Sequence, residues 1–159
     1  MEIILAENHG FCYGVKRAVE MANEAADGKG KSYTLGPIIH NPQVVGRLES
    51  KGVSPIQEVA DIDEGTMIIR SHGVGPAIYA EAEEKGLHIL DATCPHVKKA
   101  QQDAKSVIED GMTLVILGEK NHPEVKSINL WANNKGIIIE DEESAKKLQI
   151  VEKMGVVVQ

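Results

Sequence analysis

Short apolar runs alternate with stretches of helical spacing along almost the whole chain. Most of these runs have glycine or a charged residue on at least one side, as strands of a buried sheet often do. An alternation of strand and helix is typical of an α/β fold with mainly parallel sheets and helices on both faces. The runs that we predict to be strands are Ile3–Leu5, Tyr33–Leu35, Thr66–Ile69, His88–Leu90, Thr113–Leu117, Gly136–Ile139 and Gly155–Val158.

Four of the intervening stretches predict helices. In Val15–Ala26 the apolar residues recur at the i, i+3, i+4, i+7 spacing of one helix face. Pro42–Lys51, Pro76–Lys85 and Pro95–Asp110 each begin with proline, which suits the first position of a helix, and each is followed at once by glycine. The chain therefore reads as repeated strand–helix units.

The units fall into two groups. We predict that residues 1–96 form a first, complete α/β unit and that residues 97–159 form a second one. The second group has only three candidate strands, and the chain ends in or just after the last of them, at Val156–Val158. Because a parallel strand normally has neighbours on both sides and helical cover, we expect the second unit to be incomplete and the chain to be truncated.

Composition limits the possible classes of protein. A chain of 159 residues can bury a sizeable core, and its hydrophobic fraction of 42% is ordinary for a globular protein. The net charge of −7 argues against a nucleic-acid partner. We see neither the roughly 20 apolar residues of a membrane span nor a signal peptide. We therefore expect a cytoplasmic protein with no membrane partner and no structural disulfide.

Cys12 and Cys94 are the only cysteines, and each follows an apolar run that we predict to be a strand. In α/β proteins the strand ends form the crevice where ligands bind. Thiolates bind iron–sulfur clusters and zinc, but neither cysteine belongs to a CxxC pair. Three hypotheses remain open: two buried small apolar residues, a zinc site with His40 or His122, or part of an iron–sulfur site for which two thiolates are few.

Histidines recur at the same place in successive units. His40, His72, His96 and His122 each follow a predicted strand and lie near the next helix start. Free backbone N–H groups and the helix dipole attract phosphate there, and histidine adds a hydrogen bond or a charge. A single histidine in such a turn is more often a helix cap or a solvated side chain. The hypothesis of a phosphate-binding site therefore depends on the repetition of these histidines.

Three charged residues have both a chemical and a purely structural interpretation. Glu124 falls in the first turn of a predicted helix, where it can act as a general acid or base, or simply complement the helix dipole. Lys16 and Arg17 could reach a phosphate, but we expect them on an exposed helix face.

Five motifs in order closely resemble the 4-hydroxy-3-methylbut-2-enyl diphosphate reductases, the last enzymes of the methylerythritol phosphate route to isoprenoids. The resemblance covers essentially the whole chain, and five motifs at plausible spacings make it specific. The motifs are residues 10–18 (GFCYGVKRA), 36–42 (GPIIHNP), 70–74 (RSHGV), 91–97 (DATCPHV) and 122–125 (HPEV).

The resemblance implies three α/β units around a central cavity, of which this chain would hold one complete unit and most of a second. It implies a 4Fe-4S cluster on three cysteines, with one iron open to the substrate and the third cysteine missing from this chain. The residues that it assigns are Cys12 and Cys94 as cluster ligands, His40, His72 and His122 as binders of the substrate diphosphate, and Glu124 with His122 as catalytic residues.

The resemblance also implies the reaction. Two electrons and two protons would remove the allylic hydroxyl, giving isopentenyl and dimethylallyl diphosphate, with a ferredoxin or flavodoxin as donor. One departure is that Lys126-Ser127 replaces the glycine that commonly follows the last motif. Because the chain ends at Gln159, before the third cysteine and a downstream Ser/Asn set, we expect the chain alone to be inactive.

Two readings of a different class stay open. The chain could be a non-catalytic phosphate- or zinc-binding α/β module, with zinc on Cys12 and Cys94. It could also be an interaction domain whose turns are only structural.

Overall fold

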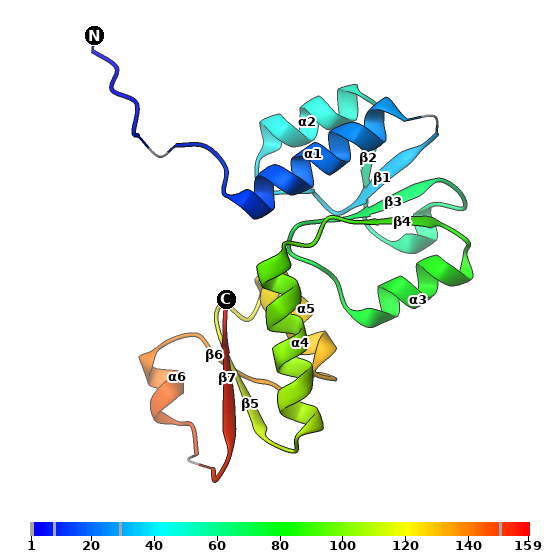
Figure 1. The fold of residues 1–159 in the computed structure, drawn as a ribbon. Coiled ribbons are helices and arrows are strands. Elements are labelled where there is room, and N and C mark those ends of the chain that lie inside the picture. Colours follow the sequence, from blue (N-terminus) through cyan, green and yellow to red (C-terminus); the bar gives the residue numbers. More distant parts are fainter. Residues whose placement is uncertain (1, 8, 29, 150) are drawn as a thin grey trace.

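The computed structural model describes residues 2–7, 9–28, 30–149 and 151–159. Two parallel sheets lie side by side, each with helices packed against it (Figure 1). The elements are α1 (Tyr13–Asp27), β1 (Ser32–Leu35), α2 (Pro42–Ser50), β2 (Val53–Ile56), the 3-10 helix η1 (Val59–Asp61), β3 (Thr66–Ile69), α3 (Pro76–Glu84), β4 (His88–Asp91), α4 (Pro95–Glu109), β5 (Thr113–Leu117), α5 (Pro123–Trp131), β6 (Ile137–Ile139), α6 (Glu142–Lys146) and β7 (Met154–Val158).

The first sheet has the strand order β2-β1-β3-β4, and all its strands are parallel. From β1 the chain crosses to β2 on one side and then returns to β3 on the other. β1 and β3 lie in direct register, with Leu35 opposite Ile69. The connections that leave these two strands diverge, which opens a crevice at their carboxyl ends. Ligands of open α/β sheets bind at such a point.

Helices cover both faces of the first sheet (Figure 1). On one face, Ala18 of α1 and Leu48 of α2 are buried against Ile68 of β3. On the other face, Ala82 of α3 packs in a second core with Met67 of β3. The predicted sheet with helices on both faces is thus confirmed for this unit.

The second sheet has the order β6-β5-β7 and is covered on one face by α4 and α5. Ile116 of β5 and Val157 of β7 are buried there against Ile128 of α5. Val107 of α4 occupies the space that a Cβ atom on Gly155 would need, so the helix approaches β7 closely.

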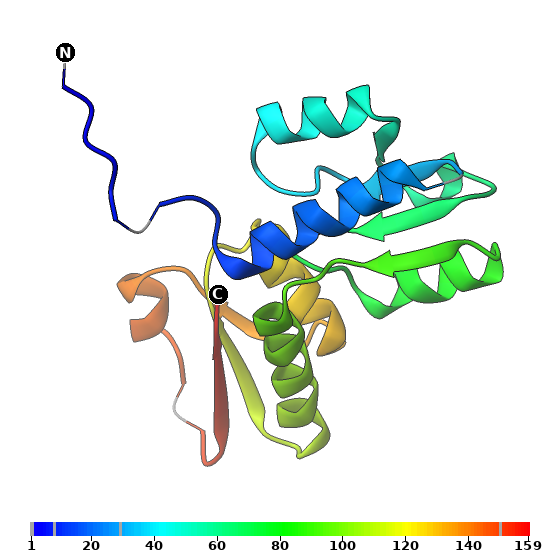
Figure 2. The ribbon, with the colours of Figure 1, turned by 45° about the horizontal axis from the view of Figure 1, so that its top comes forward.

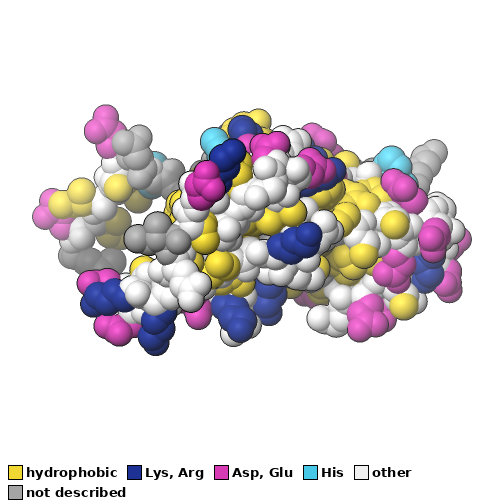
Figure 3. Space-filling model, turned by 90° about the horizontal axis from the view of Figure 1, so that it is seen from below, with side chains coloured by type: hydrophobic (Ala, Val, Ile, Leu, Met, Phe, Trp, Pro, Cys, Tyr) yellow, Lys and Arg dark blue, Asp and Glu magenta, His cyan; other side chains and the backbone are white. Residues whose placement is uncertain are grey.

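The opposite face of the second sheet leaves apolar side chains exposed. Side chains alternate across a strand, so the neighbours of buried Val157 and Ile116 point to the other face. The side chains exposed there are Leu117, Ile137, Val156 and Val158. In the space-filling view of one face of the molecule, hydrophobic side chains also lie in patches among charged ones (Figure 3).

Six of the seven predicted strands and all four predicted helices are confirmed to within two residues. The strand predicted at Ile3–Leu5 is wrong, because no strand in the described part of the chain pairs with this segment, and Ile4 is 83% exposed. The sequence analysis also missed β2, which contains Pro55. Proline is tolerated there because β2 is an edge strand that pairs only with β1.

The unit boundary between residues 96 and 97 remains a prediction. α4 begins at Pro95, just before that boundary, and packs against the second sheet through Ala104. Among the described helices, none is both long and apolar enough to cross a membrane.

Candidate functional site

Three histidines meet at the carboxyl ends of the strands. His40 lies in the connection from β1 to α2, His72 in the connection from β3 to α3, and His122 directly before α5. Their ring centroids are 4.5 Å apart for His40 and His72, 5.5 Å for His72 and His122, and 6.0 Å for His40 and His122. His96, the fourth candidate, lies exposed in the first turn of α4 and is not part of this cluster.

His122 is oriented by the start of α5. It is the N-cap residue, and its Nδ1 accepts a hydrogen bond of 3.2 Å from the backbone N–H of Glu124. In the neutral ring the proton therefore resides on Nε2, which becomes a hydrogen-bond donor. The backbone N–H of Glu124 at the start of α5 thus fixes the tautomer of the His122 ring.

Glu124 is half-buried in the first turn of α5. Burial raises the pKa of its carboxyl, and a charge on His122 only partly opposes this shift. The carboxyl consequently retains its proton to higher pH than an exposed glutamate. A proton donor that works near neutral pH needs such a shift.

The surroundings of His72 disfavour a positive charge on its ring. Burial, followed by positive charge on His40, Arg70 and His122, lowers the pKa of His72 to about 4. Its Nδ1 atom is buried and has no hydrogen-bond partner among the described residues. At neutral pH the ring is therefore uncharged, in the form that can bind a metal ion or donate one hydrogen bond to an anion.

Side chains of the second unit hold the backbone beside His72. The Ser127 hydroxyl of α5 accepts a hydrogen bond of 3.0 Å from Gln101 Nε2 and lies 2.9 Å from the His72 carbonyl oxygen, to which it can donate. Trp131 Nε1 donates to the Val74 carbonyl at 2.9 Å. Gln101 and Ser127 are buried, so these bonds join the His72 connection firmly to α4 and α5.

The two cysteines both lie at helix starts. Cys12 is the exposed N-cap residue of α1, and Cys94 is the half-buried N-cap residue of α4. A Cβ atom on Gly14 would lie 2.5 Å from Cys94 Sγ, so the first turn of α1 packs directly on that thiol. Figure 2 shows the starts of α1 and α4 close together. The prediction that Cys12 follows a strand is wrong, whereas Cys94 does follow β4.

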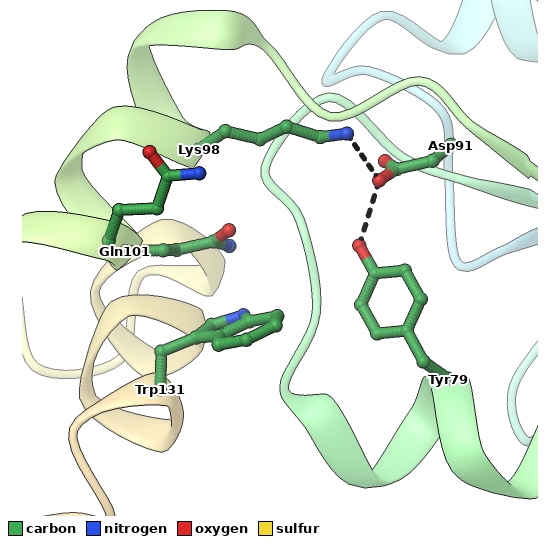
Figure 4. Close-up of a pocket in the computed structure, with 6 residues that line it drawn as sticks. Tyr79, Asp91, Lys98, Gln101 and Trp131 are labelled. Atoms are coloured by element: carbon green, nitrogen blue, oxygen red, sulfur yellow. Dashed lines mark hydrogen bonds and ion pairs between the residues drawn. The ribbon is translucent and has the colours of Figure 1, made fainter. Parts of the chain in front are cut away.

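Asp91 organises the turn that leads to Cys94, and Figure 4 shows its carboxylate between Lys98 and Tyr79. Its carboxylate accepts hydrogen bonds from the Thr93 backbone N–H at 2.9 Å and from Tyr79 Oη at 3.0 Å, and forms an ion pair of 2.6 Å with Lys98. Burial raises the pKa of Asp91, but the bonds from Lys98 and Thr93 outweigh it, so the net pKa is lowered. An ionised Asp91 thus ties β4, α3 and α4 together.

Arg17 supports the same turn from α1. Its guanidinium donates to the Thr93 carbonyl oxygen at 3.2 Å. The expectation of an exposed helix face is therefore wrong for Arg17, although Lys16 is exposed. The Arg17 contact joins residues 76 positions apart, and nothing in the local pattern indicates it.

The fold and the site define a class of protein: an α/β protein that presents clustered imidazoles at the carboxyl ends of parallel strands, with a half-buried carboxyl at one helix start and two thiols at others. The three histidines can offer ligand atoms that all lie within 4.8 Å of one another. Such a set suits an oxyanion or a metal ion.

Comparison with known proteins identifies the family to which the chain belongs. The family model described as "LytB protein" matches residues 3–159, and the chain therefore belongs to the LytB family. It is 50% identical, over all 159 residues, to the 4-hydroxy-3-methylbut-2-enyl diphosphate reductase of Geotalea uraniireducens, of which it covers 56%. It is 51% identical to the enzyme of the same name from Pelobacter propionicus, of which it covers 57%.

Solved structures agree with the computed fold. An (E)-4-hydroxy-3-methyl-but-2-enyl diphosphate reductase superimposes with a TM-score of 0.85 at 46% identity, over 99% of this chain and 57% of that one. The Plasmodium falciparum E-1-hydroxy-2-methyl-but-2-enyl-4-diphosphate reductase gives a TM-score of 0.91 at 32% identity, over 96% and 49%. The chain thus spans a little over half the length of the curated relatives named above.

Proposed function

We propose that this chain supplies the first part of a 4-hydroxy-3-methylbut-2-enyl diphosphate reductase located in the cytoplasm. The substrate would accept two electrons and two protons, lose its allylic hydroxyl as water, and leave as isopentenyl or dimethylallyl diphosphate. The observation that carries this proposal is the meeting of His40, His72 and His122 beside the carboxyl ends of β1 and β3, with Glu124 in the helix turn that follows His122.

The histidines would bind the diphosphate of the substrate. Three rings from three separate connections can donate to different phosphate oxygens, and hydrogen bonds to ionised phosphate are strong. His122 Nε2 is available as a donor because Nδ1 already accepts from Glu124 N–H. The start of α5 adds the favourable end of a helix dipole.

Glu124 would deliver a proton to the departing hydroxyl. Departure as water needs a proton at the oxygen, and a carboxyl with a raised pKa can hold one near neutral pH. The Glu124 backbone is held at the start of α5 by its bond to His122, two residues after a histidine that would bind the phosphates.

Cys12 and Cys94 would be two ligands of a 4Fe-4S cluster. They fit this role because both thiols lie at helix starts without side-chain caps, where negative charge is favoured. Because Gly14 has no side chain, the first turn of α1 leaves room for the thiol of Cys94. The chain has two cysteines, so a further ligand would come from sequence outside it. When bound, the cluster would supply electrons, from a ferredoxin or flavodoxin, and a Lewis-acidic iron.

The experiment that tests this function uses the protein that continues this chain through the full length of its relatives. We expect Glu124→Gln to lower kcat by about 10²-fold or more with little change in KM, since a proton donor acts in the chemical step. We expect His40→Asn chiefly to raise KM. Glu142→Gln, in the exposed α6, is the matched control and should leave both constants unchanged.

Two outcomes would contradict the proposal. One is full activity in Glu124→Gln, and the other is a complete protein that does not consume the diphosphate substrate under anaerobic, reducing conditions.

A second candidate function is a zinc-binding module, which the 4.8 Å spacing of the three histidine ligand atoms favours. Three imidazoles and one open position form a common zinc site. In that case the chain would bind one equivalent of Zn²⁺, His72→Asn would abolish binding, and Cys12→Ser would not affect it. Zinc binding that depends on Cys12 and Cys94 instead would point to the thiols as the metal site.

A further inference from the structure

A cavity lies next to the histidine cluster, on the side of α3. Its volume is about 380 Å³, which is within the range of small-molecule sites. The connections that follow β1 and β3 form one side, and α3 and α5 form the other. The side chains on which the argument depends are Arg70, Val74, Ile78, Lys126 and Leu130.

Arg70 is a half-buried cation without a counter-charge. Its Nε atom is buried and lacks a hydrogen-bond partner in the described part of the chain, where no carboxylate lies within 4 Å of its guanidinium. Burial lowers the pKa of Arg70, although arginine stays charged at neutral pH. An unpaired buried charge is costly, so such a side chain is typical of a site that receives an anion.

The backbone makes room for this guanidinium. Gly36 has a φ of +71°, and a Cβ atom on it would lie 2.9 Å from the nearer terminal nitrogen of Arg70. A glycine here therefore serves two needs, the left-handed turn after β1 and the space for Arg70.

Lys126 adds a second positive charge at the mouth of the cavity. It is exposed and, among the residues that the structure describes, forms no ion pair. It is also half of the Lys126-Ser127 pair that replaces a commonly found glycine. The remaining wall is apolar: Val74 and Ile78 line it, and Leu130 is 43% exposed there.

We propose that this cavity binds an anion that carries a short apolar group, of the class of the alkyl phosphates. Arg70 and Lys126 bind the phosphate, and Val74, Ile78 and Leu130 contact the alkyl group. A planar guanidinium fork matches two phosphate oxygens, whereas Lys126 acts as a point charge. None of the three clustered histidines lines this cavity, although Gly73 and Pro123, next to His72 and His122, do.

Binding of butyl phosphate and of inorganic phosphate to the 159-residue chain, followed by isothermal titration calorimetry, tests the proposal. We expect butyl phosphate to bind at least tenfold more tightly than inorganic phosphate, because the alkyl group leaves water. Arg70→Gln should weaken the binding of butyl phosphate at least tenfold, and Arg70→Lys should weaken it less. Leu130→Ser should reduce the preference for butyl phosphate over inorganic phosphate.

Two matched variants make the result decisive. Arg47→Gln removes an exposed charge of α2 outside the cavity and should leave the affinity unchanged. His40→Asn disturbs the histidine cluster, so it should weaken any binding of phosphate at the histidines but leave unchanged the binding event that depends on Arg70. Circular dichroism checks that each variant is folded.

The proposal is overturned if butyl phosphate does not bind, or binds equally well to Arg70→Gln. It is also overturned if His40→Asn, and not Arg70→Gln, abolishes binding, since the anion would then occupy the histidine cluster. That last result would leave the proposed function intact, because it would place a phosphate where the substrate diphosphate is proposed to bind.

Discussion

The two sheets of this chain are buried in different ways. The first has helices on both faces, with Ile68 and Met67 completely enclosed on opposite sides. The second has α4 and α5 on one face, while Val156 and Ile137 are exposed on the other. The histidine cluster draws His40 and His72 from the fully covered sheet and His122 from the covered face of the second. The three histidines of the candidate site therefore follow strands at sheet faces that helices cover.

The largest expected effect comes from truncating one isoleucine in each sheet. Ile68→Ala should lower the free energy of unfolding by about 3 kcal/mol or more, because it leaves a cavity in a closed core. Ile137→Ala should cost below about 1 kcal/mol, because that side chain is 41% exposed. Urea denaturation measures both. Equal losses would show that the open face of the second sheet is covered in solution.

The next effect is the pH dependence that His72 imposes. Its pKa of about 4 in the folded state lies below the 6.5 of an unperturbed histidine, so the unfolded chain binds more protons between these values. Stability therefore falls as the pH is lowered from about 6.5 toward 4. Between pH 7 and pH 5 the loss should be about 1–2 kcal/mol, allowing for partial solvent screening.

Urea titrations at pH 7 and pH 5 measure this loss, and His72→Asn should remove it. His88→Asn is the control, since His88 is exposed and lies outside the cluster. An unchanged pH dependence in His72→Asn would show that His72 is not held uncharged by its surroundings.

A smaller effect should come from the junction between the two units. Ser127→Ala leaves the buried Gln101 amide and the His72 carbonyl oxygen without their shared partner, at a cost of about 1–2 kcal/mol. Faster amide exchange near His72 would accompany this loss. Ser50→Ala, which removes an exposed hydroxyl of α2, should have almost no effect. Identical behaviour of the two variants would contradict a joining role for Ser127.

The smallest effect on stability is expected at the exposed face of the second sheet. Val156→Lys should change the free energy of unfolding by about 0.5 kcal/mol or less, since the side chain is 55% exposed. The same change should reduce concentration-dependent association and dye binding of the chain, because exposed apolar patches drive both. Analytical ultracentrifugation of the chain and the variant measures the difference, and a parent chain that is monomeric at all concentrations would refute it.

Local pattern predicted most of the fold because buried strands and amphipathic helices have distinct periodicities. β3 and β5 were predicted with their observed bounds. Residues 3–5 show the limit of such a prediction: an apolar run becomes a strand only with a partner, and periodicity contains no information about partners. β2 shows the converse, since pairing with β1 makes a strand from a segment that contains proline.

The candidate site was predictable only in part. Parallel strands bring their carboxyl ends to one edge, so histidines after successive strands could be expected to meet, and three of the four did. Arg70, Gln101 and Asp91 were missed as functional residues because their roles depend on long-range packing. Ser127 was noticed as a departure from a motif, but its bonds to Gln101 and His72 emerge only when α4 and α5 are in place.

The most direct test of the central claim is anaerobic reconstitution with iron and sulfide of the protein that continues this chain through the length of its relatives. If Cys12 and Cys94 are cluster ligands, the parent protein will bind close to four iron atoms. It will also show the broad visible absorbance of an iron–sulfur cluster, and Cys12→Ser and Cys94→Ser will each lose most of both signals. Full iron content and unchanged absorbance in either variant would contradict the account.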